Sequence, residues 1–172
     1  MNERGSSLIG GRCVKLGDHV NSDVIIPGRY LTSIDPVELA GHAFEPLGRE
    51  FQDRFRAAKV IVAGRNFGCG SAREQAASCL VGAGIQAVVA QSFARVFFRN
   101  AINTGLAALQ SADAEAHIAD GDEVFIDVAA GMIETPSGRF SFPPYPENLT
   151  RILNAGGLIP YIARKLASEA RR

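Results

Sequence analysis

The stretch KVIVAGRNFGCGSAREQAASCLVGAGIQAVVA, residues 59–90, decides the fold. It begins with a short apolar run that is typical of a buried strand, Lys59 to Gly64, and it ends with a second one, Ile85 to Ala90. Between them lie a glycine-rich loop and a predicted helix, Ala72 to Gly82, whose end is marked by glycines. Strand, loop, helix and strand in this order predict a unit of an α/β layer with parallel strands.

The segments after residue 90 extend this layer and then leave it. Ser92 is predicted to cap a helix that runs to about Asn103, and LAALQ, residues 106–110, is predicted to be a third strand. Residues 121–142 alternate in polarity and contain turn residues, which predicts antiparallel strands. Residues 148–172 predict two short helices separated by a pair of glycines.

The segments before residue 59 carry turn residues between short apolar runs. Residues 11–31, GRCVKLGDHVNSDVIIPGRYL, predict short strands joined by tight turns. DPVELAGHAFE, residues 35–45, predicts a helix with Asp35 as N-cap, and residues 47–56 predict another. We therefore expect one mixed α/β domain over residues 1–172, with residues 1–10 as a flexible tail.

Composition and charge exclude several classes of function. The 172 residues are 47% hydrophobic, and 18 basic residues balance 18 acidic ones, so no basic field is available to hold nucleic acid. No apolar run approaches the roughly 20 residues that span a bilayer, and the N-terminus lacks the apolar core of a secretory signal. We expect a cytoplasmic protein whose partners are small molecules or other proteins.

The three cysteines do not form a recognisable framework. Cys13, Cys69 and Cys79 are widely spaced and include no C-x-x-C pair, so neither a disulfide framework nor a zinc site is predicted. Their spacing gives no support to an iron–sulfur cluster on this chain either.

The loop GRNFGCGSARE, residues 64–74, is the best candidate for chemistry. It joins a buried strand to a predicted helix, so it should lie at the carboxyl edge of the sheet, where open α/β folds bind ligands. Glycines such as Gly70 let the backbone approach an anion, the helix N-terminus favours negative charge, and Arg73 can hold a carboxylate with two hydrogen bonds. In the alternative interpretation, the glycines form a tight connection, Ser71 caps the helix, and Arg73 is a solvated first-turn residue.

Other glycine loops fit this stretch less well. A phosphate-binding P-loop ends in Gly-Lys-Ser/Thr, whereas here Gly70 is followed by Ser71 and Ala72. A dinucleotide fingerprint needs G-x-G-x-x-G and an acidic residue after the second strand, and this chain has Gln91 there. A nucleophilic Cys69 lacks a recognisable histidine partner.

Three motifs occur along the chain in a fixed order: NSDVIIPGRYL (21–31), GRNFGCGSARE (64–74) and SFARVFFRNAINTGL (92–106). Together they resemble the small subunits of 3-isopropylmalate dehydratase, an isomerase of leucine biosynthesis in the aconitase superfamily, over roughly residues 11–165. That family typically reads N-T-D-x-I-I-P-A-R-Y-L and G-x-N-F-G-C-G-S-S-R-E-H. The resemblance implies the swivelling β/β/α domain of the aconitase type, with mixed sheets and a β-α-β-α-β layer.

For function, the resemblance implies one half of a hydro-lyase active site. A separate large subunit would carry a [4Fe–4S] cluster on three cysteines, and this chain would hold no cofactor and be active only in that complex. The substrate would be a small 2-hydroxy dicarboxylate, isomerised by dehydration and rehydration. Ser71 would be the base, acting as an alkoxide, and Arg73 and Arg29 would hold carboxylates. Gly70 would belong to the substrate-binding loop, and Asp23 would be structural or support the site.

The chain departs from the family pattern at two positions. Ala72 stands where the second serine of S-S-R contacts substrate, and Gln75 replaces the histidine of R-E-H. In the specificity loop, a neutral Thr32 is where an arginine accompanies substrates with a third carboxylate, as in homoaconitase, so a small or apolar distal group is favoured. 3-Isopropylmalate fits this best. 2-Methylmalate (citraconate), 2,3-dimethylmalate and homoaconitate chemistry remain alternatives, as does a catalytically inactive binding or regulatory domain.

Overall fold

The computed structural model describes residues 8–170 of the chain. In chain order, its strands, α-helices and short 3₁₀ helices (η) are β1 (Leu8–Lys15), α1 (Ser22–Ile25), η1 (Gly28–Tyr30), α2 (Pro36–Ala40), η2 (Glu45–Leu47), α3 (Arg49–Ala57), β2 (Val60–Ala63), α4 (Gln75–Gly82), β3 (Ala87–Ala90), α5 (Arg95–Thr104), β4 (Ala107–Gln110), α6 (Ala112–His117), β5 (Glu123–Asp127), β6 (Met132–Thr135), β7 (Gly138–Ser141), α7 (Glu147–Asn154) and α8 (Leu158–Glu169).

The seven strands form one mixed sheet in the order β4-β3-β2-β1-β5-β6-β7. The strands β1 to β4 are parallel, and the helices α4 and α5 connect β2 to β3 and β3 to β4, as the β-α-β-α-β pattern predicts. The strands β5, β6 and β7 pair in antiparallel fashion, which the alternating residues 121–142 predict. The prediction of a mixed α/β fold is therefore confirmed.

The strand β1 joins the two parts of the sheet. Its first residues pair antiparallel with β5, from Leu8 opposite Asp127 to Arg12 opposite Glu123. Its last residues pair parallel with β2, beginning with Cys13 opposite Val60. One strand thus supports both the α/β layer and the antiparallel strands.

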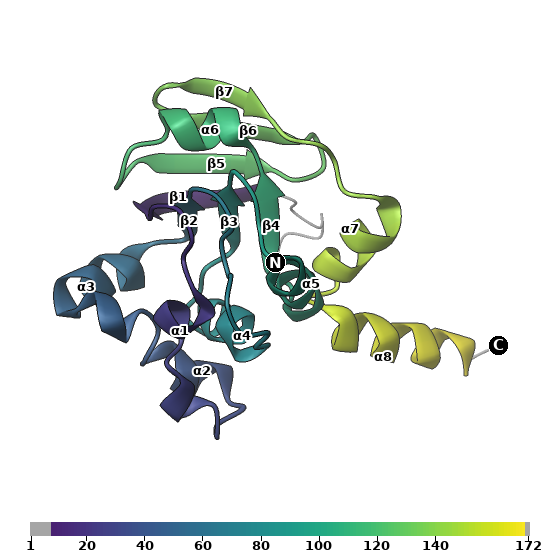
Figure 1. Ribbon diagram of the computed structural model, residues 1–172. Coiled ribbons are helices and arrows are strands. Elements are labelled where there is room, and N and C mark those ends of the chain that lie inside the picture. Colours follow the sequence, from purple (N-terminus) through teal and green to yellow (C-terminus); the bar gives the residue numbers. More distant parts are fainter. Residues whose placement is uncertain (1–7, 171–172) are drawn as a thin grey trace.

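The central strands are buried on both faces. Ile61 and Val88 face the helices α1 to α5, whereas Val60 and Val89 pack with α6 and the antiparallel strands. Figure 1 shows these two layers on opposite sides of the sheet, with α1 to α4 below and α6 with β5 to β7 above. Burial on both faces explains why the strands of this part are unbroken apolar runs and do not alternate.

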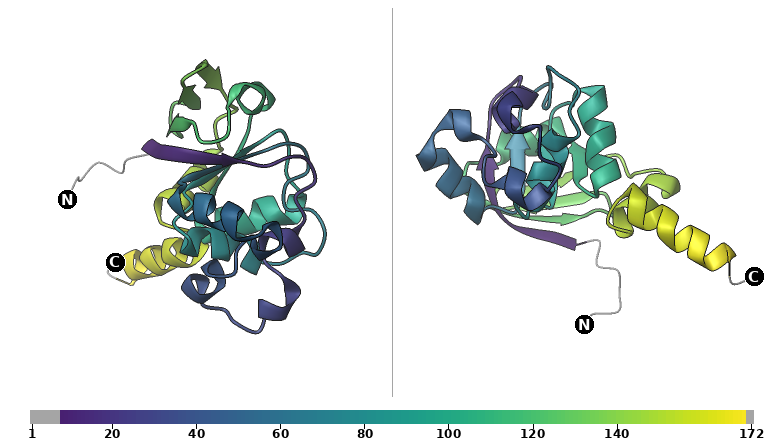
Figure 2. Two further views of the ribbon diagram at one scale, coloured as in Figure 1. Left: turned by 90° about the vertical axis from the view of Figure 1, so that its left-hand side faces the viewer. Right: turned by 90° about the horizontal axis from the view of Figure 1, so that it is seen from below.

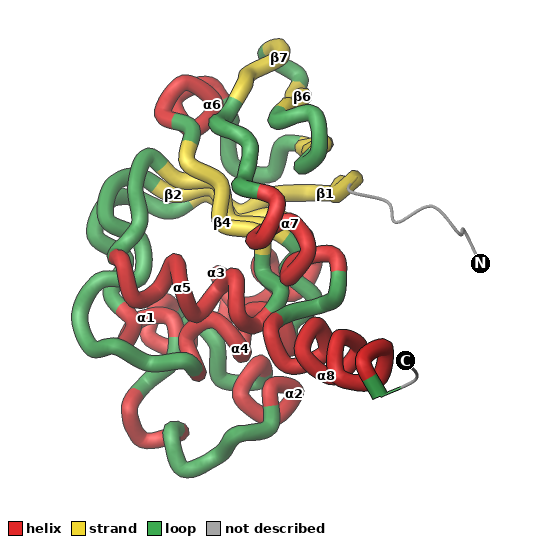
Figure 3. The backbone as a smooth tube through the Cα atoms, turned by 90° about the vertical axis from the view of Figure 1, so that its right-hand side faces the viewer, coloured by secondary structure: helices red, strands yellow, loops and turns green. Residues whose placement is uncertain are grey.

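The two ends of the sheet are brought together by two side-chain hydrogen bonds that are not part of the strand pairing. The Ser111 hydroxyl, just after β4, donates to the backbone oxygen of Ser141 at the end of β7 (3.2 Å). The Tyr145 hydroxyl donates to the backbone oxygen of Ala108 in β4. The sheet is therefore curled around the side chains that pack with α6 and the antiparallel strands, as the tube in Figure 3 shows. The helix α8 projects from the body of the molecule (Figure 2).

Three local predictions are corrected by the structure. Residues 22–30 form α1 and η1 where short strands are predicted, because the Asn21 side chain accepts a hydrogen bond from the Asp23 N–H (2.9 Å) and caps a helical turn. The helix α4 begins at Gln75, three residues after the predicted start, with Glu74 at its N-cap. Ser92 does not cap α5, since its hydroxyl accepts a hydrogen bond from the Asn66 N–H (2.9 Å).

Two further predictions concern the ends of segments. Asp35 caps α2 as predicted, accepting a hydrogen bond from the Val37 N–H (2.9 Å), with Pro36 in the first turn. The expected flexible tail, residues 1–10, falls mostly on residues 1–7, which lie outside the described residues, and residues 8–10 are the start of β1. In the part of the chain that the structure describes, no helix has the length and apolar character needed to cross a membrane.

Candidate active site

The loop of residues 64–74 lies at the carboxyl edge of the parallel strands, between two other loops. Phe67 forms a parallel bridge with Phe93 from the β3–α5 loop, and Cys69 forms one with Asn21 from the β1–α1 loop. The Gly68 N–H donates to the backbone oxygen of Val20 (2.8 Å). The loop is therefore held on both sides by backbone hydrogen bonds that continue the sheet.

Glycine is required at two positions of this loop. Gly68 has φ +76°, and a Cβ atom there would lie 2.2 Å from Cγ of Phe97 in α5. Gly70 has φ +87°, and a Cβ atom there would lie 2.5 Å from Oδ1 of Asn21. Both positions combine a left-handed backbone with close contact, so a side chain is excluded twice. The bare sequence of the loop follows from this crowding.

Ser71 lies on the exposed side of the loop, immediately after this crowded part. Its backbone oxygen accepts a hydrogen bond from the hydroxyl of Ser22 (2.9 Å). Within residues 8–170, its own hydroxyl makes no hydrogen bond, and the N–H groups of Ser71, Ala72 and Glu74 have no protein acceptor. Because Glu74 is the N-cap residue of α4, Ser71 is not a helix cap. The loop presents a free hydroxyl beside unpaired N–H donors, an arrangement that suits an anionic group.

Arg73 is held against the segment that follows β1. Its side chain is 19% exposed, and Nη1 forms an ion pair with Oδ1 of Asp23. Both terminal nitrogens lie near Gly28, at 3.5 Å from the position of a Cβ atom built there. The guanidinium is thus oriented by Asp23 and still has donors for a carboxylate.

Arg29 is placed differently from Arg73. Its side chain is 62% exposed, forms an ion pair with Glu45 and lies over the ring of Tyr30, with Cζ 4.8 Å from the ring centroid. The Tyr30 hydroxyl donates to the second oxygen of Glu45 (2.6 Å), and this bond together with Arg29 lowers the pKa of the Glu45 carboxyl. His42 stacks on Tyr30 with ring centroids 3.7 Å apart. Arg29 can bind a substrate carboxylate with the donors that Glu45 leaves free, or by exchanging the Glu45 carboxylate for another.

The remaining predicted residues lie on the surface around the loop. Gly70 and Ala72 are exposed, and so is Thr32, which makes no hydrogen bond within the described residues. Thr32 follows η1 on the same segment as Arg29, and Ile34 beyond it is 89% exposed. The structure therefore brings Ser71, Ala72 and Arg73 together on one loop, with Arg29 and Thr32 on the neighbouring segment.

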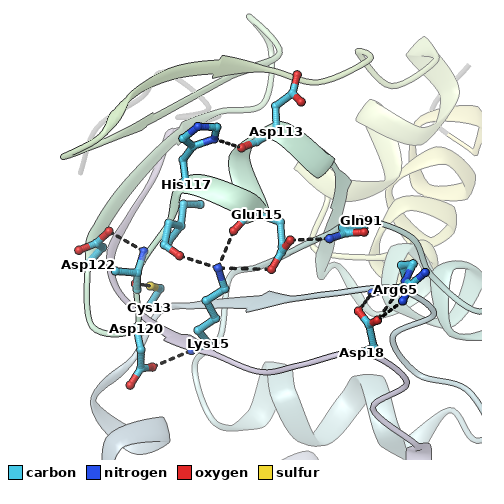
Figure 4. Close-up of polar contacts among 12 residues, drawn as sticks. Cys13, Lys15, Asp18, Arg65, Gln91, Asp113, Glu115, His117, Asp120 and Asp122 are labelled. Carbon is cyan, nitrogen blue, oxygen red and sulfur yellow. Dashed lines mark hydrogen bonds and ion pairs between the residues drawn. The ribbon is translucent and has the colours of Figure 1, made fainter.

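Sequence reasoning missed several residues that fix this edge of the sheet. The Asp18 carboxylate accepts hydrogen bonds from the backbone N–H (2.7 Å), Nε (3.0 Å) and Nη2 (2.6 Å) of Arg65. These bonds join the β1–α1 loop to the start of the glycine loop (Figure 4). Asp18 also explains Gly64, where a Cβ atom would lie 2.0 Å from Oδ1 of Asp18. Ser22 is 1% exposed and had no distinguishing sequence pattern.

Gln91, which argues against a dinucleotide site, has a structural role. Its side chain donates to Oε2 of Glu115 (2.6 Å), and Lys15 donates to the backbone oxygens of Glu115 (2.6 Å) and Ile118 (2.8 Å). Lys15 also lies 3.3 Å from the Glu115 carboxylate. Figure 4 shows that this network ties α6 to the carboxyl ends of β1 and β3, so these groups support the fold where the sheet meets α6.

The cysteines differ in environment. Burial raises the pKa of the Cys13 thiol and raises the pKa of Cys79 to about 12, whereas Cys69 is partly exposed. In the part of the chain from 8 to 170, no group of three or more His, Cys, Asp or Glu could hold a metal ion. The described residues do not fit an iron–sulfur cluster.

We predict that an alkylating reagent at about pH 8 modifies Cys69 of the isolated chain well before Cys79. The thiolate is the reactive form, and burial keeps Cys79 protonated and out of contact with the reagent. Peptide mass spectrometry after timed labelling measures the order. Labelling of Cys79 as fast as Cys69 in the folded chain would contradict this assignment, and unfolding in denaturant should make the two react alike.

The mixed curled sheet, with the glycine-rich loop at its parallel edge, defines a swivelling domain of the aconitase type. In agreement, a family model described as the aconitase C-terminal domain matches residues 46–114. The 3-isopropylmalate dehydratase small subunit of Moorella thermoacetica is 47% identical over 164 residues, which is 94% of this chain and 99% of that protein. The corresponding protein of Pyrobaculum calidifontis is 46% identical, covering 92% of this chain and 99% of that protein.

A solved structure agrees with these relatives. The crystal structure of 3-isopropylmalate dehydratase from Methanocaldococcus jannaschii matches with a TM-score of 0.87 and 42% identity, over 96% of this chain and 99% of that one. The chain belongs to the 3-isopropylmalate dehydratase small-subunit family, a family of hydro-lyases. The words "small subunit" in the relatives' names imply a larger partner subunit.

Proposed function

We propose that this chain is the catalytic small subunit of a 3-isopropylmalate dehydratase, with Ser71 as the proton-abstracting base. The observation that carries the proposal is the exposed Ser71 hydroxyl beside unpaired N–H groups, on the same loop as Arg73. Family membership supports the reaction class and the substrate, a 2-hydroxy dicarboxylate with an isopropyl group.

In this mechanism, the Ser71 alkoxide accepts the proton from the carbon next to a substrate carboxylate. The hydroxyl leaves the neighbouring carbon as hydroxide, and a double bond forms. A water molecule then adds its hydroxide to the carbon that lost the proton, its remaining proton converts the released hydroxide to water, and Ser71 returns the abstracted proton to the carbon that lost the hydroxyl. A serine hydroxyl is far too weak an acid to ionise in water, so its surroundings must favour the anion. The loop N–H groups and the Arg73 guanidinium are placed to supply that stabilisation.

The substrate carboxylates are assigned to the two arginines. Arg73 binds one of them, since Asp23 already fixes the orientation of its guanidinium. Arg29 binds the other after releasing Glu45. We assign the [4Fe–4S] cluster, with its open iron for the substrate hydroxyl, to the large subunit, because the described residues of this chain do not fit one.

The test is anaerobic reconstitution with the large subunit, followed by a screen of 2-hydroxy diacids. The complex should interconvert 2- and 3-isopropylmalate, and the chain alone should show no dehydratase activity and contain no iron. Stoichiometric iron and sulfide in the chain alone would overturn the assignment of the cluster. A complex with an intact cluster that turns over none of the diacids would make this chain a binding or regulatory domain.

A second substrate is favoured by one observation. Ala72 is exposed on the loop where the family pattern has a hydroxyl, so one substrate contact is lost. The same chemistry on 2-methylmalate or 2,3-dimethylmalate therefore belongs in the screen. A higher kcat/KM for one of these than for 3-isopropylmalate would reassign the substrate and keep the mechanism.

We predict that Thr32→Arg shifts the preference of the complex toward a 2-hydroxy tricarboxylate by at least about tenfold. The neutral Thr32 side chain leaves a distal carboxylate without a partner, and a buried carboxylate needs one. The ratio of kcat/KM for homoaconitate-like and isopropyl substrates measures the shift. Thr32→Gln is the matched control, with a similar length and no charge, and should not produce it. A wild-type complex that already prefers tricarboxylates would contradict the prediction that a small or apolar distal group is favoured.

A further inference from the structure

Residues 21–23, Asn-Ser-Asp, lie along the catalytic loop and contact it residue by residue. The Asn21 side chain fills the space left by Gly70. The Ser22 hydroxyl donates to the backbone oxygen of Ser71 (2.9 Å), and Asp23 holds Arg73. One short segment thus touches the loop at three of four consecutive positions.

This segment is fixed to the core on its other side. The Ser22 N–H donates to the backbone oxygen of Cys69 (2.7 Å), and the side chains of Ile25 and Ile26 at the end of α1 are fully buried. The backbone oxygen of Ile25 in turn accepts from the Phe44 N–H (2.9 Å). The segment is therefore a firm support against which the glycine-rich loop can be placed.

Ser22 is the residue of this segment that contacts Ser71, the base of the proposed mechanism. Its side chain is buried, and its hydroxyl donates to the main chain of the residue that the proposed mechanism uses. The hydrogen bond fixes the Ser71 backbone from behind and leaves the Ser71 hydroxyl on the exposed side. Just before Ser71 the loop packs closely against Phe97 and Asn21 through glycines. Ser71 itself is held by the Ser22 hydroxyl.

We propose that Ser22 is a positioning residue for the reaction, and that it sets the orientation of Ser71 through the hydrogen bond to the Ser71 backbone oxygen. This inference rests on the proposed function of Ser71. It separates the roles of two neighbours: Ser22 governs proton abstraction, whereas Asp23 governs the grip of Arg73 on a carboxylate. A displaced base lowers turnover, and a displaced arginine weakens substrate binding.

In the reconstituted complex, Ser22→Ala should lower kcat by about 10- to 100-fold with KM within about twofold of wild type, because a small misplacement of a reacting group has effects of this size. Exchange of the abstracted substrate hydrogen with deuterated solvent should fall in parallel. Asp23→Asn should chiefly raise KM. Ser22→Thr keeps the hydroxyl and should restore most of kcat, and Ser22→Cys, a weaker donor, should fall between Thr and Ala.

The matched control is Ser111→Ala. Ser111 is also a buried serine whose hydroxyl donates to a backbone oxygen, that of Ser141, and it additionally caps α6. It should lose at least as much stability as Ser22→Ala and keep a wild-type kcat. If Ser111→Ala lowers kcat as much as Ser22→Ala does, the effect of Ser22 is one of stability alone and the inference is overturned.

A second measurement does not depend on turnover. The amide hydrogens of Gly68 and Ala76, which donate to the backbone oxygens of Val20 and Arg73 on either side of Ser71, should exchange faster in Ser22→Ala than in wild type, with β2 and β3 unchanged. Unchanged exchange at these residues, or a kcat within twofold of wild type in the assembled Ser22→Ala complex, would overturn the inference. An inactive wild-type complex with the exchange difference intact would instead remove the proposed function and leave the support of the loop by Ser22 standing.

Discussion

Ser71→Ala is expected to lower turnover of the reconstituted complex by about 10²–10⁴-fold, at the upper end of that range or beyond it for an activated alkoxide. Removing Oγ takes away the group that accepts the substrate proton in the proposed mechanism. Because Ser71 is exposed and does not cap α4, the free energy of unfolding should change by no more than about 0.5 kcal/mol. The stability loss of a helix cap is therefore not expected.

Two measurements in the same complex test this expectation. Turnover is compared with the exchange of the abstracted substrate hydrogen in deuterated solvent, and both should fall together. Ser137→Ala, an exposed serine in the turn between β6 and β7, serves as the control and should behave as wild type. Exchange at a near wild-type rate in Ser71→Ala, with cluster and assembly intact, would assign the base to another group.

Gly68→Ala is expected to cause the largest loss of stability, about 2–5 kcal/mol. The left-handed φ at this position costs a residue with a Cβ about 1–2 kcal/mol, and overpacking a dense interior adds about 1–3 kcal/mol. The new methyl group would meet Phe97, which is 3% exposed and packs edge to face against Phe67. Neither ring can move without disturbing the core beneath the loop of residues 64–74.

Gly121→Ala separates the two contributions. Gly121 also has a left-handed backbone, φ +87°, but a Cβ atom there would meet nothing within 4 Å. Only the backbone cost of about 1–2 kcal/mol should appear in this variant. Chemical denaturation of both variants measures the difference. Equal losses for Gly68→Ala and Gly121→Ala would mean that Phe97 yields and that the packing argument is wrong.

The parts of the fold that sequence alone predicts are those in which one local pattern dominates. The buried strands around Ile61 and Val88 are unbroken apolar runs, and the helix of α2 has both its cap and its proline. In residues 22–30, a short apolar run between turn residues predicts a strand, and this prediction is wrong. A single hydrogen bond from the Asp23 N–H to Asn21, together with burial of Ile25, determines the helical turn instead.

For the candidate site too, sequence alone predicts some residues and misses others. The motif predicts Ser71 and Arg73 as site residues, and they lie on the exposed loop between β2 and α4. The hydrogen bond from Ser22 to Ser71 and the contacts of Asp18 with Arg65 were not predicted, because Ser22 and Asp18 are distant in sequence from the loop and act through contacts that only the fold creates. The pairing of Arg29 with Glu45 could not be read from the sequence for the same reason.

The strand β1 also has a consequence for how the chain folds. The strand pairs with two distant parts of the sequence, with β2 from Val60 on one side and with β5 up to Asp127 on the other. Neither half of the sheet can be joined to the other before the ribosome has released residue 127, and such long loop closures slow folding. The first strand to be made is thus among the last to be completed. Until then the unpaired backbone groups along its edge are open to unintended pairing, so the yield of folded protein should depend on the speed of this final step.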